Sequence, residues 1–254
     1  PVHLLEAGLQ HPRCLAVVAL TNIHEVNLKI AITSKLLRPG IKVICRADFP
    51  DVEANMDSFG TDHIIDPYDT FAQHLAVALQ VPGLYLLHEW LTGVRHQPLT
   101  DPVHPPVSGQ WIVCGFGRFG QAVYNSLSKE GLRPVVVEAT PEKTGAPEEG
   151  CIVGRGTEAA TLVEAGIDQA AGLVAGTDDD ANNLSIIMTA RILQKNLFVV
   201  ARQNQEMNEP IFDAIEADMV MHPSAIIANK IRVLLGTPLL YEFMSLAKHQ
   251  DDAW

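Results

Sequence analysis

The sequence lacks long apolar runs, basic clusters and paired cysteines, and each absence excludes a class of protein. The 254-residue chain contains no run of 18 apolar residues, so no segment is expected to span a membrane. No Lys/Arg cluster offsets the net charge of −12, so nucleic acid is not expected as a partner. The four cysteines form no C-x-x-C pair, which favours reduced, buried thiols in a cytosolic protein. No signal-peptide pattern is present.

An internal repeat runs through most of the chain. It aligns residues 21–85 with residues 177–241 at a constant offset of 156, without a gap. Identical pairs include Thr21 with Thr177, Asn27 with Asn183, Arg46 with Arg202, Asp62 with Asp218 and Pro67 with Pro223. Solenoid repeats have periods of about 20–50 residues, so this longer period indicates a duplicated domain. We therefore expect two homologous modules in tandem.

The second copy has the pattern of alternating strands and helices. Short apolar runs predict strands at 111–114, 134–137, 151–153, 173–175, 197–201 and 219–221. Helical patterns occupy 121–129, 162–166, 183–195 and 225–235, and a final short helix runs to about Leu246. Uninterrupted apolar strands between helices are typical of parallel sheets covered on both faces. The expected fold class is α/β, with Rossmann-like doubly wound parallel sheets.

The first copy matches only the later half of this pattern. Its expected strands lie at 15–20, 42–45 and 63–65, and no glycine loop precedes them. Prolines at 98, 102, 105 and 106 predict a stiff, extended connection. The predicted organisation is a partial first module at 1–97, a linker at 98–109 and a complete second module at 110–254.

A glycine-rich loop follows the first strand of the second copy. Its residues are Gly115, Phe116, Gly117, Arg118, Phe119 and Gly120, which form G-x-G-x-x-G. The pattern alone is weak, but here it lies between a strand and a helix, and Glu138 ends the next strand. That context is typical of dinucleotide binding, in which the glycines allow a tight turn, an approach by pyrophosphate and close packing. The helix N-terminus then offers N–H groups to phosphate.

Glu138 and Arg118 suggest which nucleotide would bind. A carboxylate at position 138 would accept hydrogen bonds from ribose hydroxyls and repel a 2′-phosphate, which favours NAD or adenosine ligands over NADP. Arg118 lies within reach of phosphate. The alternative is a glycine turn kept for packing, with a solvated Glu138.

Other polar residues are weaker candidates. The acidic turn at 178–180 suits either a cation or the cap of the next helix, and capping is favoured. Thr177 lies at the carboxyl end of a strand, where such sheets bind ligands. The histidines at 24, 63, 74, 88 and 222 show no metal-ligand spacing, so no metal site is expected. Arg46 and Arg202 follow matching strands, and either structural ion pairs or ligand contacts would explain them.

At these motifs the chain resembles the RCK family of regulators of potassium conductance, also called TrkA-N or KTN domains. The second copy carries GFGRFG at 115–120, LVEAGI at 162–167, GTDDDANNLSIIMTARIL at 176–193, VVARQ at 199–203 and MVMHPS at 219–224. The first copy carries LLEAGL at 4–9, NLKIAITSKLL at 27–37, VICRA at 43–47 and DHIIDP at 62–67. The resemblance implies a module on the cytoplasmic face of the membrane that binds NAD(H), ATP, ADP or AMP. It also implies a potassium channel pore or Trk/Ktr-type transporter subunit as partner, in the same or a separate polypeptide.

One position departs from the family pattern. The resemblance implies an acidic or amide residue after the glycine that follows the third strand, but Arg155 stands there. The candidate cofactor-binding residues are therefore the loop 115–120 with Glu138, Arg155, Thr177 and Asp178, and none is expected to be catalytic.

Assembly and two rival functions complete the expectations. The isoleucines at 186, 187, 226, 227 and 231, with Leu235, cannot all face one sheet, so contact between modules and a homodimer or ring are expected. An NAD-dependent oxidoreductase is the first rival, although the repeat leaves no room for a substrate domain. The second is an assembly module whose nucleotide site does not function.

Overall fold

The computed structural model describes residues 1–93 and 101–247, in two compact units. One unit contains Pro1–Pro67 and Ile227–Trp254, and the other contains Tyr68–Ile226. The first three residues of the predicted linker at 98–109 lie outside the described residues. In the described ranges, no helix is long and apolar enough to cross a bilayer.

The larger unit contains a six-stranded parallel sheet in the order β6-β5-β4-β7-β8-β9. Its strands are β4 (Gln110–Cys114), β5 (Val135–Glu138), β6 (Cys151–Val153), β7 (Ala170–Ala175), β8 (Phe198–Arg202) and β9 (Met219–Met221). Counted along the chain, this order is 3-2-1-4-5-6, which is the Rossmann arrangement. The predicted doubly wound α/β fold is therefore confirmed. The order reverses between β4 and β7, and ligands bind at the carboxyl ends of the strands beside such a reversal.

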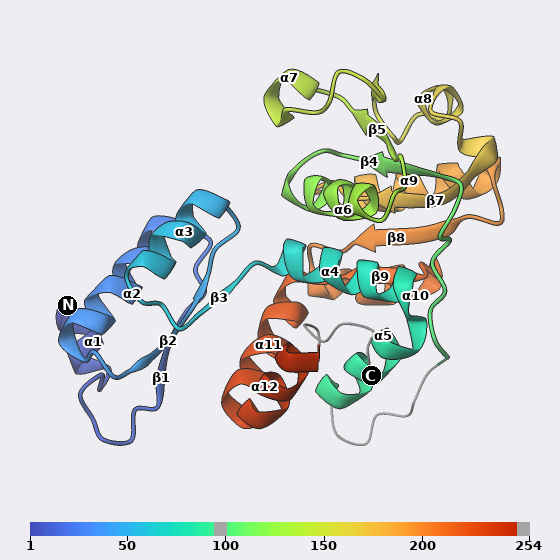
Figure 1. The fold of residues 1–254 in the computed structure, drawn as a ribbon. Coiled ribbons are helices and arrows are strands. Elements are labelled where there is room, and N and C mark those ends of the chain that lie inside the picture. The colour runs from blue at the N-terminus through green and yellow to red at the C-terminus, as the bar shows by residue number, and fades with distance from the viewer. Residues whose placement is uncertain (94–100, 248–254) are drawn as a thin grey trace. The chain divides into compact units, whose positions relative to one another are not determined.

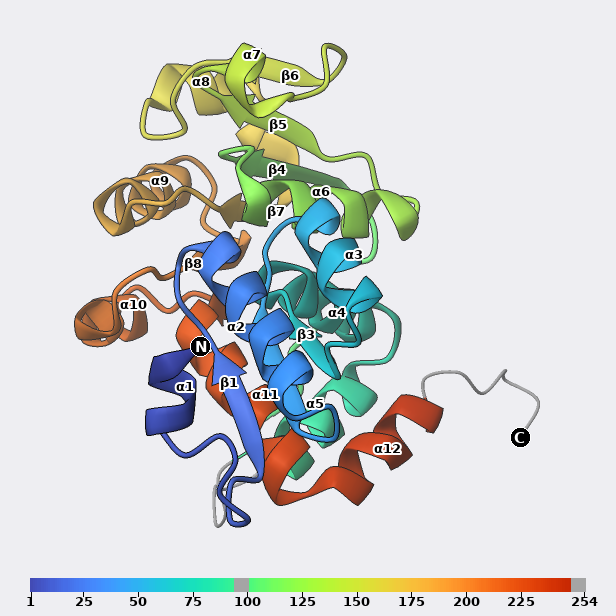
Figure 2. The same ribbon diagram turned by 90° about the vertical axis from the view of Figure 1, so that its left-hand side faces the viewer.

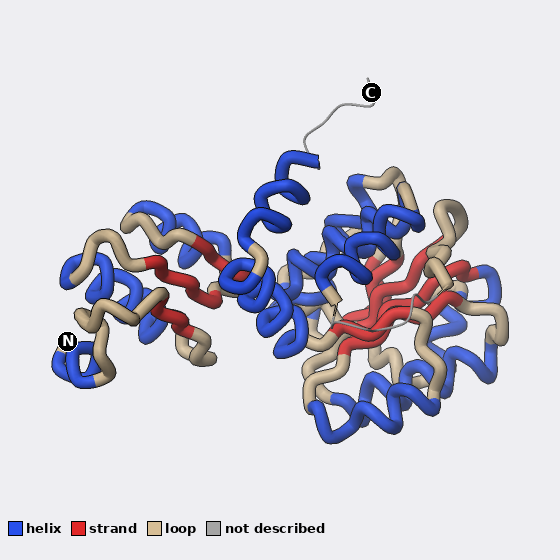
Figure 3. Tube along the Cα trace, turned by 90° about the horizontal axis from the view of Figure 1, so that it is seen from below, coloured by secondary structure: helices blue, strands red, loops and turns tan. Residues whose placement is uncertain are grey.

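Helices cover both faces of this sheet (Figure 3). They are α4 (Pro67–Gln80), α5 (Pro82–Thr92), α6 (Arg118–Lys129), α7 (Pro141–Thr144), α8 (Ala159–Glu164), α9 (Asp180–Leu193) and α10 (Glu209–Ala214), with short 3-10 turns at Ile167–Gln169 and Glu206–Asn208. Figure 2 shows α9 and α10 on one side of the strands and α6 on the other. Side chains alternate along β4, so Ile112 packs in the cluster that contains α9, while Trp111 and Val113 pack in the cluster that contains α6.

Helix α4 belongs to the first sequence repeat but packs on the sheet of the second. Phe71 and Leu75 are buried in one cluster with Trp111 and Phe119. The Ser126 hydroxyl of α6 also donates to the Ala72 carbonyl at 2.9 Å. The expected contact between modules through this helix is confirmed within the larger unit.

The smaller unit likewise combines elements of both repeats, here a sheet of the first repeat with helices of the second. Its parallel sheet has the order β1-β2-β3 and is accompanied by three helices of the first repeat. These elements are α1 (Val2–Glu6), β1 (Ala16–Ala19), α2 (His24–Leu37), β2 (Lys42–Arg46), α3 (Pro50–Ser58) and β3 (His63–Ile65). From the second repeat come α11 (Pro223–Gly236), from Ile227 onward, and α12 (Pro238–Ala247). Ile227 and Leu234 of α11 are buried with Ile44 and Ile65. The sequence repeats and the compact units therefore divide the chain differently.

Helix α9 departs from the expectation about surplus isoleucines. Ile186 and Ile187 are both buried against their own sheet. Adjacent residues are about 100° apart on a helix, so one apolar stripe holds both. The apolar side chains that α9 leaves outside include Met188 and Ile192, which are 60% and 79% exposed, and Leu193 at its end.

Candidate nucleotide site

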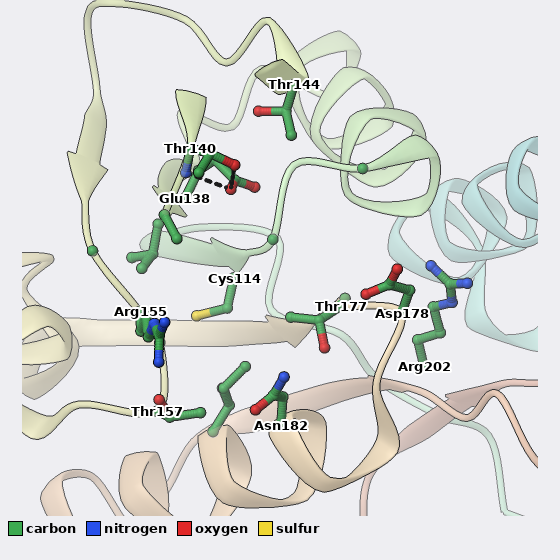
Figure 4. A pocket seen from close by; sticks show the side chains of 18 of the residues that line it. Cys114, Glu138, Thr140, Thr144, Arg155, Thr157, Thr177, Asp178, Asn182 and Arg202 are labelled. Carbon is green, nitrogen blue, oxygen red and sulfur yellow. Dashed lines mark hydrogen bonds between the residues drawn. The ribbon is translucent and has the colours of Figure 1, made fainter. Parts of the chain in front are cut away.

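A cavity of about 600 Å³ opens at the carboxyl ends of the central strands of the larger unit. Its volume lies in the range of about 300–1,000 Å³ that is usual for ligand sites. The loops after β4, β5, β6 and β7 line it together with the first turns of α6 and α9, and Arg202 comes from the end of β8 (Figure 4). The cavity therefore lies at the topological switch point, where a Rossmann sheet binds its ligand.

Each of the three glycines of the loop is a glycine for a different reason. Gly115 has a φ of +89°, a conformation that side chains rarely adopt. A Cβ on Gly120 would lie 2.0 Å from the Gly115 carbonyl oxygen, so this position needs glycine for the packing of loop on helix. A Cβ on Gly117 would meet no protein atom within 4 Å, and Gly117 has ordinary dihedral angles of −70° and −173°. Of these three glycines, Gly117 is the one that lines the cavity although the fold itself would accept a side chain there. Glycine is expected at such a position when a ligand must come close to the backbone.

Helix α6 begins directly behind this loop. Gly117 is its N-cap residue and has no side chain that could accept a hydrogen bond. The backbone N–H groups of the first helical turn, at the cavity, therefore have no side-chain cap. These groups and the helix dipole suit an anion.

Glu138 has a structural role in addition to the predicted one. Its carboxylate is buried and accepts hydrogen bonds from the Phe116 N–H at 2.7 Å and the Thr140 N–H at 2.9 Å. The side chain thus fastens the glycine loop to the end of β5 while it lines the cavity. Recognition of ribose hydroxyls by Glu138 stays a prediction. The Thr140 hydroxyl also donates to the Glu138 carboxylate at 3.4 Å. A carboxylate has about four acceptor positions, so these three bonds leave room for a ligand mainly at Oε2.

Comparison of the two repeats shows that Arg202 lacks the carboxylate partner that its counterpart has. In the first repeat, the guanidinium of the equivalent Arg46 forms two 2.8 Å bonds with the carboxylate of Asp48. At the position matching Asp48, the second repeat has Asn204, which cannot neutralise Arg202. Within the described ranges, Arg202 forms no ion pair shorter than 4 Å, and its buried Nε atom has no hydrogen-bond partner.

Arg202 is held instead by an aromatic ring and by more distant charges. Its Nη2 atom donates to the Tyr68 hydroxyl at 3.4 Å, and its guanidinium lies 5.1 Å from the centre of that ring. Arg118 lies at the same distance from the Tyr68 ring. Burial lowers the pKa of Arg202, against the opposing effects of Tyr68 and Asp178. Arg202 and Asp178 lie side by side at the cavity in Figure 4. The site therefore has a partly desolvated cation that is only weakly neutralised, which suits a phosphate.

The acidic turn before α9 mainly caps and anchors that helix. Asp179 accepts from the Asn182 N–H at 2.8 Å, as an N-cap residue does. Asp180 is buried and accepts from the backbone N–H of Asn204 at 2.6 Å and from the side chain of Asn208 at 2.7 Å. Burial would raise the pKa of Asp180, but these hydrogen bonds outweigh it and hold the pKa below its usual value. Capping was the favoured interpretation, and the hydrogen bonds agree with it.

The structure brings seven of the ten predicted site residues to the cavity. They are Gly115, Gly117, Arg118, Glu138, Arg155, Thr177 and Asp178. Phe116, Phe119 and Gly120 do not line it. Phe119 is fully buried in the core against Phe71, with ring centres 5.5 Å apart, because the helical start of α6 turns this side chain toward the sheet.

Sequence reasoning missed several side chains that line the cavity. They include Cys114, Thr140, Thr144, Thr157, Asn182 and Ile186. Asn182 and Ile186 lie within the motif at 176–193, but nothing in that motif marks these two positions as facing a cavity. Cys114 ends β4, and the threonines follow β5 and β6. Arg202 was considered only with its counterpart Arg46, and the change from Asp48 to Asn204 is the signal that separates the two arginines.

Comparison with known proteins places the chain. Residues 2–67 and 111–223 match the TrkA-N domain, and together they cover more than half of the chain. Potassium channel protein 1 of Methanocaldococcus jannaschii is 27% identical over 154 residues, which are 58% of this chain and 46% of that protein. A Trk system potassium uptake protein TrkA homolog of Pyrococcus horikoshii is 31% identical over 137 residues, or 50% of this chain and 60% of its own length. The chain thus spans less than two thirds of either relative.

Solved structures of the GsuK channel have the same fold. The structure bound to ADP has a TM-score of 0.69 at 21% identity and covers 93% of this chain and 55% of its own. The structure bound to NAD has a TM-score of 0.70 at 18% identity and covers 93% and 54%. At these identities the likeness establishes the fold.

Proposed function

The chain belongs to the TrkA-N domain family, and we propose that it is the adenine-nucleotide-sensing regulatory part of a potassium channel or a Trk/Ktr-type potassium uptake system. The names of its relatives support a role in potassium transport. The solved GsuK structures with ADP and with NAD support an adenine nucleotide as ligand. In such a system the domain lies on the cytoplasmic face of the membrane and acts on a pore in the same or another polypeptide.

The observation that carries this proposal is the cavity built from the Gly117 loop, Glu138 and Arg202. The open face of Gly117 and the first turn of α6 supply backbone donors for a phosphate. Arg202 supplies a charge that, in the part of the chain that the structure describes, no carboxylate approaches within 4 Å. Glu138 disfavours a 2′-phosphate, so NAD(H), ATP, ADP or AMP are the proposed ligands.

The chemistry of the cavity favours sensing over catalysis. Among the described residues, its lining contains no histidine, lysine, serine or tyrosine. Its carboxylates are Glu138, which is bonded to the glycine loop, and Asp178, which faces Arg202. Its one thiol belongs to Cys114, and burial raises the pKa of that group to about 12. This thiol stays protonated at neutral pH and is a poor nucleophile. We therefore propose that the bound nucleotide is a signal rather than a reactant.

Assembly into a dimer or ring is part of the proposal. Helix α9 leaves Met188 and Ile192 exposed, and α2 leaves Leu36 78% exposed. Exposed apolar side chains on equivalent helices of the two repeats are surfaces that a second copy would bury. Light scattering tests this part, and a monomer at micromolar concentration with and without nucleotide contradicts it.

A thermal-shift panel tests the ligand. NAD, NADH, ATP, ADP and AMP should each be compared with NADP at one concentration. A ligand at 100 times its dissociation constant stabilises the folded state by about 2.7 kcal/mol, which shifts the melting temperature by several degrees. Stabilisation by NADP above all the others contradicts the role of Glu138. No shift with any nucleotide favours the alternative of an assembly module with a non-functional site.

A further inference from the structure

Helices α4 and α5 form a helical hairpin (Figure 1), and it carries a second cluster of polar side chains. His74 is on α4, and His88 and Glu89 are on α5, which follows after the single residue Val81. The nitrogen and oxygen atoms that these three residues offer all lie within 4.8 Å of one another. No other group of this kind occurs among residues 1–93 and 101–247.

The distances suit a small divalent metal ion. Nδ1 of His88 lies 3.5 Å from Oε1 of Glu89, and Nδ1 of His74 lies 3.8 Å from the same atom. In a tetrahedral zinc site with bonds of about 2.0–2.1 Å, ligand atoms are about 3.3 Å apart. The two nitrogen–oxygen distances therefore need to shorten by a few tenths of an ångström to half an ångström. The two nitrogens lie within 4.8 Å of each other, so reaching the same spacing needs a shift of up to about 1.5 Å, which rotation of the imidazole side chains would have to supply. Two imidazoles and one carboxylate also form a ligand set that zinc sites use, with water as the fourth ligand.

The surroundings of the cluster leave a polar atom in need of a partner. Nδ1 of His88 is buried and forms no hydrogen bond, since its neighbour Oε1 of Glu89 lies 3.5 Å away, and a metal ion between the two atoms would satisfy both. The side chains of His74 and His88 are 18% and 19% exposed, and that of Glu89 is 45% exposed. An ion can thus enter from solvent while the imidazoles stay held by the helices.

The second repeat shows that a hairpin of this kind folds without the cluster. At the offset of 156, His74, His88 and Glu89 correspond to Lys230, Met244 and Ser245. This set cannot bind the same ion, yet α11 and α12 form the matching pair of helices. The two histidines and the glutamate are thus extra to the architecture, which favours a role in binding.

We propose that His74, His88 and Glu89 form a binding site for a divalent transition metal ion, with zinc the best match to the ligands. The ion clamps α5 to α4. Helix α4 in turn packs on the nucleotide-binding unit through Leu75, and its Tyr68 contacts Arg118 and Arg202 of the cavity. Metal binding would then be a second signal, besides the nucleotide, that acts on the larger unit. The spacing of 14 residues between the histidines hid this site from the sequence, because a helical hairpin rather than one helix turn brings them together.

The test is calorimetric titration of the EDTA-stripped chain with zinc chloride, repeated with cobalt to read the coordination geometry from its visible spectrum. The background carries Cys14→Ser and Cys151→Ser, which removes the two partly exposed thiols as competing ligands. One site per chain is expected, with a tetrahedral cobalt spectrum. His74→Gln and His88→Gln should each weaken binding about tenfold or more. His3→Gln is the matched control, because His3 lies 3.4 Å from Glu6 in a fully exposed pair and should have no effect.

A second variant separates loss of the site from loss of the fold. It combines His74→Lys, His88→Met and Glu89→Ser, the residues that the other repeat's hairpin already uses. It should keep the wild-type circular dichroism spectrum and lose the metal site. Zinc binding that survives in this variant and in both glutamine variants overturns the proposal, as does the absence of stoichiometric binding to the background chain.

Discussion

Substitution of Gly117 by aspartate separates the effect of the glycine loop on folding from its effect on binding. Gly117 has dihedral angles that any residue adopts, and an added Cβ has open space around it. It is also the N-cap of α6, where aspartate is preferred over glycine by a few tenths of a kcal/mol. Gly117→Asp should therefore leave the stability of the ligand-free protein unchanged or raise it slightly.

Binding should change in the opposite direction. The new carboxylate would face the phosphate of a bound nucleotide at the start of α6. Two like charges about 4 Å apart repel by about 4 kcal/mol at an effective dielectric constant near 20. This corresponds to an affinity loss on the order of 10³-fold. Gly117→Ser keeps a good N-cap without the charge and should lose much less.

Urea unfolding of the ligand-free chain and calorimetric titration with ADP and NAD measure the two quantities. Gly120→Ala is the contrasting variant, because its Cβ would lie 2.0 Å from the Gly115 carbonyl oxygen. It should destabilise the ligand-free protein by about 1–3 kcal/mol. Wild-type affinity in Gly117→Asp would refute the position assigned to the phosphate. A loss of more than about 1 kcal/mol in its ligand-free stability would show that the glycine is structural.

Further predictions concern the charges around the cavity. Arg202→Gln should remove the cation of the cavity, and calorimetry should then show weaker ADP binding, whereas Arg46→Gln, in the other repeat, should leave it unchanged. The folded-state pKa of Asp180 lies below the unfolded value, so its ionised form contributes stability above pH 3.8 that is lost as pH falls through the lowered pKa. Urea midpoints between pH 6 and pH 3 should therefore fall, and less steeply in Asp180→Asn. With NADH and small carbonyl substrates, absorbance assays should detect no turnover, and a useful rate would contradict the regulatory function.

The sequence by itself determined the elements and much of the cavity. The strands are short apolar runs, and each strand within residues 1–93 and 101–247 lies where one was expected. Gly115, Gly117 and Glu138 were recognised because a dinucleotide loop needs glycine and acid at fixed spacing after a strand. The repeat indicated two modules because identical residues recur at a constant offset, and some of these residues form the same hydrogen bonds in both copies. Asn27 and Asn183, for example, each bond the backbone of the threonine six residues earlier.

Tertiary structure alone decided which sheet each late helix covers. The repeats are homologous, so α4 matches the sheet of either copy by pattern, and only the packing of Phe71 and Leu75 against Trp111 shows the choice. The same packing places Tyr68 beside Arg202, a pair 134 residues apart. His74 and His88 meet because of the turn at Val81, not because of helical spacing. Local patterns reflect backbone geometry over a few residues, whereas contacts between distant segments depend on which of several similar apolar surfaces come together.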